Sequence, residues 1–211
     1  TFECISKSGS ASPVSSPVST EEWRILLQGL FHPDSTIWTG SRYDSDKSNF
    51  HSLRDIVRLD RPDELVAKTS DCFALGIFKA DAQARRSEYL IGCDYILIES
   101  DELIGKKAEN DDEREKNKRM SASMIQWLNG YDDMTLRAVY DTGGKSLHSI
   151  WDTPPDDTME LLKPFCESLG IDSQPLTNST APLRLPLSKH EKTGKPARLL
   201  YLNPKQFKNE S

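Results

Sequence analysis

The chain has 211 residues, enough for one sizeable hydrophobic core or two closely fused lobes. Its 33 acidic residues outnumber 27 Lys and Arg, and a net charge of -6 argues against nucleic-acid binding through global charge alone. The positive charge gathers at the end, because residues 178–211 hold five lysines and two arginines against two glutamates. An acidic middle before a basic end suits a metal site beside a phosphate site, although such a tail is often only solvated.

The first residue is Thr1 rather than Met, so we expect a piece of a longer protein. The four cysteines, Cys4, Cys72, Cys93 and Cys166, are scattered and form no C-x-x-C pair. This spacing excludes a zinc ribbon and a disulfide framework, so we expect reduced and mostly buried thiols. The sequence has no apolar run long enough to span a bilayer and no visible signal peptide, which predicts a soluble, cytoplasmic protein.

The first third of the chain predicts a polar segment followed by short helices and strands. Residues 1–19 are rich in Ser and Pro and cannot bury enough apolar surface to fold, so we expect a tail or linker. The folded core is expected over residues 20–205, with a short tail over 206–211. The predicted elements are a capped helix from Thr20 to Leu30, a strand over Ile37–Gly40, a loop over Asp44–Phe50, helices over Leu53–Val57 and Asp63–Lys68, and a strand over Phe73–Phe78.

A strand that ends in acidic residues follows. The segment Cys93–Glu102 has the sequence CDYILIESDE, and its short apolar run predicts a buried strand. Alternate side chains of a strand share a face, so Glu99 and Asp101 point the same way and Ser100 points the other way. Two carboxylates that close repel each other unless they are neutralised, usually by a divalent cation with oxygen ligands. The alternative is that the strand simply ends here and the acids are solvated loop residues.

The second half of the chain alternates helices with hairpins. The charged stretch Gly105–Lys118, with five acids and two bases over Glu109–Lys116, predicts a solvated helix or a mobile insertion. The other predicted elements are an amphipathic helix over Ser121–Leu128, a hairpin of Met134–Tyr140 with Leu147–Trp151, a helix over Thr158–Leu169 ended by Gly170, and strands over Leu183–Leu185 and Arg198–Leu202. This mixed order predicts an α+β fold around an antiparallel sheet rather than a doubly wound parallel sheet.

The hairpin turn holds residues that suit phosphate binding. The run Gly143–Ser146 resembles the end of a P-loop, but that motif requires glycine where Val139 stands and opens a helix, whereas the next residues alternate like a strand. Ser146 and His148 lie two apart and share a face. Together with the ammonium of Lys145, they could donate to the oxygens of a triphosphate. The alternative is an ordinary hairpin with a surface histidine.

Two other nucleic-acid chemistries fail on the same strand. Rolling-circle nucleases need two histidines flanking one hydrophobic residue, whereas His148 is followed by Ser149 and Ile150. An RNA-recognition module needs exposed aromatic and basic residues on its central strands, and neither hairpin strand supplies them.

Two later residues are further candidates for the site. Asp172 follows Gly170 at the end of a predicted helix, where a loop can return a third carboxylate to the sheet. The alternative is an ordinary acid of a helix-terminal loop. Arg184 lies in the basic segment, and because a guanidinium binds phosphate bidentately it is the better candidate for a specific phosphate contact.

In this order the segments resemble the catalytic core of archaeo-eukaryotic-type primases (the AEP superfamily), in particular the primase-polymerase domains of plasmids, phages and other mobile elements. Such domains have a hydrophobic strand ending in an acid-x-acid pair, then a small-x-His motif on a later strand, then a third acid after a helix. The resemblance covers residues 73–202. The similar segments are YILIESDE at Tyr95–Glu102, GGKSLH at Gly143–His148, LGID at Leu169–Asp172, NSTAPLRLP at Asn178–Pro186 and ARLLYL at Ala197–Leu202.

This resemblance implies a role for each candidate residue. The implied metal-binding carboxylates are Glu99, Asp101 and Asp172, and the implied cofactor is Mg²⁺ or Mn²⁺. The implied ligands of the triphosphate are Ser146 and His148, assisted by Lys145 and Arg184. The departures from the family pattern are Ala181 and Leu187, where related sequences often have arginine and glycine, and Lys106–Lys118, which looks like an insertion between the first motif and its helix.

The implied fold is an α+β primase core with an N-terminal αβ lobe and an RRM-like C-terminal lobe. The implied function is template-directed nucleotide polymerisation that makes or extends primers on single-stranded DNA. The implied partners are the template, the primer, nucleoside triphosphates and a helicase domain in the full-length chain. The alternatives are a metal-dependent nuclease using the same acids, and a non-catalytic replication-initiator module that binds DNA regardless of Mg²⁺ or Mn²⁺.

Overall fold

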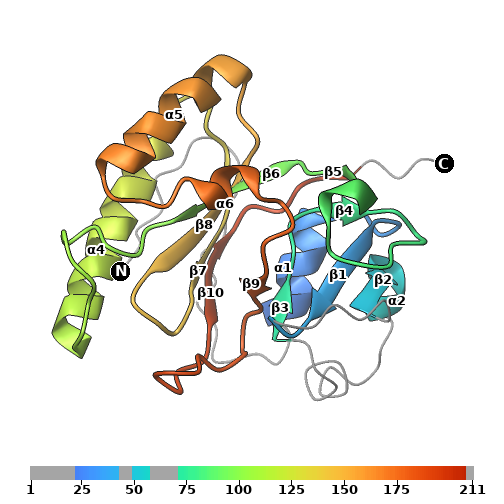
Figure 1. Cartoon of the computed structure of the whole chain (residues 1–211), viewed down its shortest axis with the longest axis horizontal. Helices are drawn as coiled ribbons and strands as arrows, with labels where there is room; N and C mark the ends of the chain where they lie inside the picture. Colours follow the sequence, from blue (N-terminus) through green and yellow to red (C-terminus); the bar gives the residue numbers. More distant parts are fainter. Residues whose placement is uncertain (1–21, 43–48, 58–70, 208–211) are drawn as a thin grey trace.

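The structure, a computed structural model, describes residues 22–42, 49–57 and 71–207. The predictions of a tail over 1–19, a helix cap at Thr20 and a helix over 63–68 lie outside the described residues. The predicted loop over 44–50 lies mostly outside them too, and its last residue, Phe50, begins a strand. Figure 1 shows two lobes, with the long helices α4 and α5 at one side and α1 with the short strands at the other.

The N-terminal lobe packs a helix on a sheet of short antiparallel strands. The strand order is β5-β4-β1-β3-β9, with β2 paired to β1. Its elements are α1 (Glu22–Leu30), β1 (Thr36–Gly40), β2 (Phe50–Ser52), α2 (Leu53–Val57), β3 (Cys72–Phe73), β4 (Ile77–Phe78), a 3₁₀ turn η2 (Ser87–Tyr89), β5 (Leu90–Gly92) and β9 (Leu183–Arg184). Because β9 comes from late in the chain and pairs with β3, the C-terminal part of the sequence completes this sheet.

The single strand predicted over Phe73–Phe78 is wrong, because the structure has two short strands there. Both β3 and β4 pair with β1, but the backbone between them leaves it. The amide of Gly76 donates instead to the carbonyl of Ser179, at 2.9 Å. A backbone group that finds a partner outside the ladder interrupts the strand, and that partner lies about a hundred residues further along the chain.

The C-terminal lobe is a four-stranded antiparallel sheet in the order β10-β7-β8-β6. Its elements are β6 (Tyr95–Glu99), α4 (Asp111–Leu128), β7 (Leu136–Asp141), β8 (Leu147–Asp152), α5 (Asp156–Ser168), the short α6 (Gln174–Thr177) and β10 (Arg198–Leu202). The predicted hairpin is the β7–β8 pair. The expectation of an α+β fold built on antiparallel sheets is confirmed.

The two faces of this sheet carry separate hydrophobic cores. On one face Ile98 and Trp151 pack with Ile125 of α4. On the other face Leu97 and Ile150 belong to the core that includes α1 and β1. Since side chains alternate along a strand, residues two positions from Leu97 or Ile150 also point toward the N-terminal lobe. Glu99 lies two residues after Leu97, and His148 lies two residues before Ile150.

Most of the charged stretch forms the beginning of a helix. Helix α4 begins at Asp111, capped by Asn110, whose side chain accepts from the amide of Glu113 at 2.9 Å. Three acids in the first turn interact favourably with the positive end of the helix dipole. Residues 111–118 form the first half of the helix that continues to Leu128, which confirms the solvated helix predicted as one alternative for this stretch. The insertion over Lys106–Lys118 relative to the family pattern stays a prediction.

The three described cysteines, Cys72, Cys93 and Cys166, are free thiols. Burial raises the pKa of Cys72 to about 12 and that of Cys166 to about 11, so both remain protonated at neutral pH. In the part of the chain that the structure describes, no helix combines the length and apolar character needed to cross a membrane.

A buried carboxylate joins α1 to β10. Glu22 is 3 % exposed and forms a salt bridge with the guanidinium of Arg198 at 2.9 Å. Its carboxylate also accepts a hydrogen bond from the amide of Leu199 at 2.9 Å. We expect Glu22→Gln to lower the free energy of unfolding by about 1–3 kcal/mol, because it weakens charge-assisted bonds. Urea denaturation measures this loss. The exposed acid Glu160 of α5 provides the control, since Glu160→Gln should change stability by less than about 0.5 kcal/mol. Equal effects of the two variants would contradict the prediction.

Candidate active site

Two acids at and just after the end of β6 line one cavity. Ser100 is fully buried, and its hydroxyl donates to Oγ of Ser121 on α4 at 2.6 Å. Glu99 and Asp101, on either side of it, are half-buried and line a cavity of about 540 Å³. Strand β6 ends at Glu99, so Asp101 lies in the bend after it and not on the strand as predicted. Both acids nevertheless line the same cavity, and Ser100 between them contacts α4.

A histidine faces the first acid across the sheet. In the pairing of β6 with β8, Glu99 lies opposite His148, whose Nε2 is 3.0 Å from Oε1 of Glu99. On the other side of β8, Tyr140 of β7 lies opposite His148 and its hydroxyl is 3.1 Å from Nδ1. Three side chains thus form a row across three strands. The phenol of Tyr140 fixes the orientation of the imidazole ring. Burial raises the pKa of Tyr140 well above its usual value of 10.

The Glu99 carboxyl is held in its ionised form. The electrostatic interaction with His148 is the largest cause, and with the hydrogen bond from His148 and the charges of Arg42 and Lys145 it outweighs the opposing effect of burial. These interactions lower the pKa of Glu99 to about 2. A carboxylate that stays charged at neutral pH is suited to hold a cation.

The donor set fits a divalent metal ion. Among the described residues, Glu99, Asp101 and His148 offer one ligand atom each, and these atoms lie within 4.8 Å of one another. Carboxylate oxygens are the ligands preferred by Mg²⁺ and Mn²⁺, and Mn²⁺ also accepts imidazole. The three side chains therefore lie close enough together to form one candidate ion site.

The hairpin turn brings a cation and a hydroxyl beside the acids. Nζ of Lys145 is 2.9 Å from Oδ2 of Asp101 and 3.6 Å from Oε1 of Glu102. Ser146 is buried at the cavity wall. The strand β8 follows directly, which confirms that the turn does not open a helix as a P-loop does. Gly143 has a φ of 75°, and a Cβ there would lie 2.4 Å from the carbonyl oxygen of Lys195, so the turn requires glycine.

Asp172 lies on the cavity wall but apart from the two-acid cluster. Helix α5 ends where Gly170 takes a φ of 72° and the amide of Ile171 donates to the carbonyl of Cys166 at 2.9 Å, which turns the chain back toward the sheet. Asp172 is exposed, and its carboxylate accepts the amide of Gln174 at 2.9 Å.

Arg184 reaches the cavity from β9, opposite Cys72 of β3. Its Nη1 donates to the carbonyl of Lys189 at 2.9 Å, which orients the half-buried guanidinium. All seven candidate residues from the sequence therefore line one cavity. They are Glu99, Asp101, Lys145, Ser146, His148, Asp172 and Arg184.

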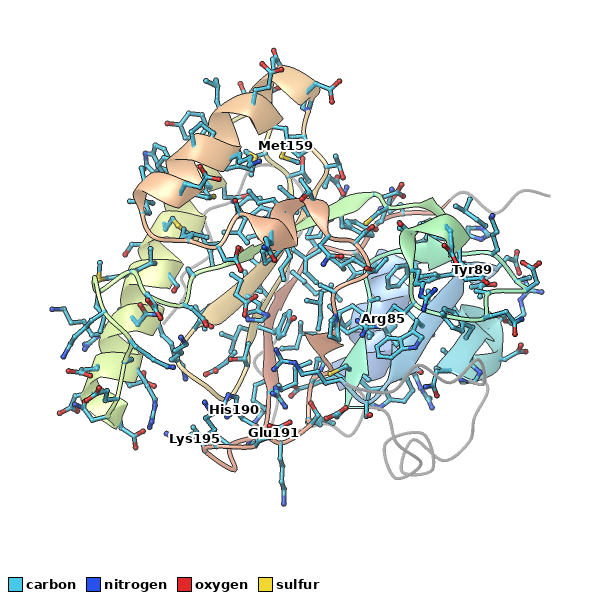
Figure 2. The ribbon with its side chains drawn as sticks, in the orientation of Figure 1. Arg85, Tyr89, Met159, His190, Glu191 and Lys195 are labelled. Atoms are coloured by element: carbon cyan, nitrogen blue, oxygen red, sulfur yellow. The ribbon has the colours of Figure 1, made fainter. Side chains whose placement is uncertain are left out.

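Sequence reasoning missed three features of this site. Arg42, from the N-terminal lobe, lines it and lowers the pKa of Glu99. Tyr140 was read only as part of a strand. The segment between β9 and β10 forms another wall, which includes His190 and Glu191, and Figure 2 labels both residues there. The only sequence signal for that wall was its basic composition.

Comparison with known proteins supports the fold assignment. No protein-family model matches the sequence, and no curated protein matches it. Among solved structures, the chain is similar to the AEP domain (PP-N190) of the primase-polymerase of cyanophage S-2L, with a TM-score of 0.54 and 15 % sequence identity. The similarity covers 90 % of this chain and 93 % of that domain. The chain therefore has the fold of an AEP domain, as the sequence segments implied.

The lowered pKa of Glu99 predicts a pH dependence of stability. Its folded pKa of about 2 lies below the model-compound value of 4.5, so the stabilisation is complete above pH 4.5 and is lost as the pH falls toward 2. We expect the free energy of unfolding to fall more steeply over this window in the unmodified protein than in Glu99→Gln. Denaturation with EDTA present measures both slopes. The control Glu102→Gln keeps the Glu99–His148 pair and should keep the steep slope; equal slopes for all three proteins would contradict the assignment.

Proposed function

We propose that this chain is a DNA primase-polymerase, a metal-dependent nucleotidyltransferase that makes or extends primers on single-stranded DNA. The observation that carries the proposal is the convergence of Glu99, Asp101 and His148 beside the Lys145–Ser146 turn. An acidic ion site next to hydroxyl and ammonium groups is the arrangement that nucleotidyl transfer needs. The AEP fold of the chain supports this proposal, since its solved neighbour is a primase-polymerase domain.

The acids are assigned to the metal ions of the reaction. Glu99 and Asp101 would hold Mg²⁺ or Mn²⁺ together, and Asp172 would approach from the loop after α5. When bound, such ions act as Lewis acids on the attacking 3′-hydroxyl and the α-phosphate and neutralise the leaving pyrophosphate. The carboxylates themselves contribute fixed geometry and negative charge, so the protein acts mainly through positioning and electrostatics.

The cationic and hydroxyl groups are assigned to the triphosphate of the incoming nucleotide. Ser146, just before β8, and His148, within β8, both line the cavity. Lys145 and Arg184 would supply positive charge. His148 would hold the triphosphate while its interaction with Glu99 lowers the pKa of that acid. The proposed partners are a single-stranded DNA template, a primer, nucleoside triphosphates and a helicase domain in the full-length protein.

We expect Asp101→Asn to abolish primer synthesis without unfolding the protein, because it removes a metal ligand and relieves repulsion with Glu99. A primer-synthesis assay on single-stranded DNA, with Mg²⁺ or Mn²⁺ and with ribo- and deoxynucleotides offered separately, measures the effect. Glu102→Gln is the control, since this neighbouring acid lies outside the three-residue cluster and its variant should stay active.

The same assay separates the alternatives. Degradation of the DNA without added nucleotides would indicate a nuclease. DNA binding that is indifferent to metal, with no synthesis, would indicate an initiator module. Normal synthesis by Asp101→Asn would contradict the assignment of the acid pair.

Asp172 gives an independent prediction because it lies apart from the other acids. If it supplies the third carboxylate, Asp172→Asn should lower kcat by about 100-fold or more, a loss typical of removing one electrostatic group from an active site. Single-turnover extension of a labelled primer measures the rate. The nearby exposed acid Glu167 is the control, and Glu167→Gln should leave the rate unchanged. An unchanged rate in Asp172→Asn would show that Asp172 is not a metal ligand and that Glu99 and Asp101 are the metal-binding carboxylates.

A further inference from the structure

A buried asparagine of α4 connects the ends of two strands. Asn117 is fully buried, and its single Nδ2 donates to the carbonyl of Ser100 at 2.9 Å and to that of Lys145 at 2.8 Å. Ser100 lies between the two acids at the end of β6, and Lys145 lies in the turn before β8. One side chain therefore touches the backbone of both halves of the candidate active site.

Neighbouring residues of α4 strengthen this connection. Ser121, one turn after Asn117, accepts from the hydroxyl of Ser100 at 2.6 Å and donates to the carbonyl of Asn117 at 3.0 Å. Lys118 pairs at 2.8 Å with Oδ2 of Asp141, the last residue of β7. Asn117 and Ser121 lie on the same buried face of α4 as Ile125, which packs on the sheet. This face therefore reaches the end of β6 and the turn before β8, while Lys118 contacts the end of β7.

Helix formation does not explain an asparagine at this position. Asparagine is a weaker helix former than alanine, and a buried amide is costly unless its groups are paired. Oδ1 of Asn117 is buried and receives no hydrogen bond from any described residue. The contribution of this side chain therefore comes from its amide donor, which hydrogen-bonds two backbone carbonyl oxygens just outside the ends of β6 and β8.

We propose that Asn117 is a positioning residue that fixes the Glu99–Asp101 pair relative to the Lys145–Ser146 turn. Its effect on catalysis rests on the proposed function, but its effect on the geometry does not. Groups behind a metal site orient the ligands in front of them, and their loss typically weakens metal affinity or activity about 10–100-fold. Asn117 acts in this way through the backbone of Ser100 and Lys145, and contacts neither substrate nor ion itself.

The test compares Asn117→Ala with Ile125→Ala on the same helix. Ile125 is 1 % exposed and lies in the core between α4 and the sheet, on the face of the sheet away from the cavity. Its truncation removes more buried apolar surface than that of Asn117 and leaves the hydrogen bonds at the strand ends in place. Hydrogen exchange over residues 99–104 and 142–147 reports the local geometry, and calorimetric titration with Mn²⁺ alone reports the ion site. Both are measured where each variant is fully folded, and Asn117→Ser and Ile125→Val replace any variant that does not fold.

We expect Asn117→Ala to speed exchange in both segments and to weaken Mn²⁺ affinity about 10-fold or more, while Ile125→Ala keeps both near the values of the unmodified protein. Unchanged exchange in Asn117→Ala, or equal changes in the two variants, would overturn the proposal. A protein that neither binds Mn²⁺ nor makes primers would defeat the proposed function instead, and the exchange measurement would still decide the role of Asn117.

Discussion

The register between β6 and β8 is the constraint on which the candidate site depends. It sets Glu99 opposite His148, and the next pairing along the sheet sets Tyr140 on the other side of that histidine. Because side chains alternate along strands, a slip of one residue would turn these groups toward α4 and α5 and turn core residues toward the cavity. The two hydrophobic cores therefore stabilise one register, and that register determines which polar groups meet.

Charge compensation explains how two acids tolerate such a position. Glu99 pairs with His148 at 3.0 Å, and Asp101 pairs with Lys145 at 2.9 Å. Half-buried carboxylates without partners would repel each other and take up protons. The partners of both acids come from the same short strand and turn, so one hairpin supplies these contacts and the proposed triphosphate contacts. Asn117 ties this hairpin to the acids from the far side of the sheet.

Features of the site that depend on the repeat of side-chain directions within one strand were predictable from the sequence. Features that depend on residues far away in the sequence were not. The prediction that Glu99 and Asp101 face one side follows from the two-residue repeat of a strand, and both line one cavity although Asp101 lies beyond the end of β6. Tyr140 could not be distinguished from an ordinary core tyrosine, because its role depends on a neighbouring strand. The break in the strand after Phe73 depends on the carbonyl of Ser179. The start of α4 was readable from Asn110 and the acids after it, but the high charge of the segment left a mobile insertion open as an alternative.

The connection between β6 and β8 also bears on the order in which the chain assembles. Tyr140 and His148 are 8 residues apart and meet across a tight turn, whereas Ile98 and Ser149 meet across 51 residues that include all of α4. Closing a short loop costs less chain entropy than closing a long one, so the hairpin can form well before β6 joins it. The histidine is then in place before its glutamate arrives. Ion-binding capacity would emerge only when α4 docks, which makes the chemistry of this cavity a late product of folding rather than a property of any isolated piece.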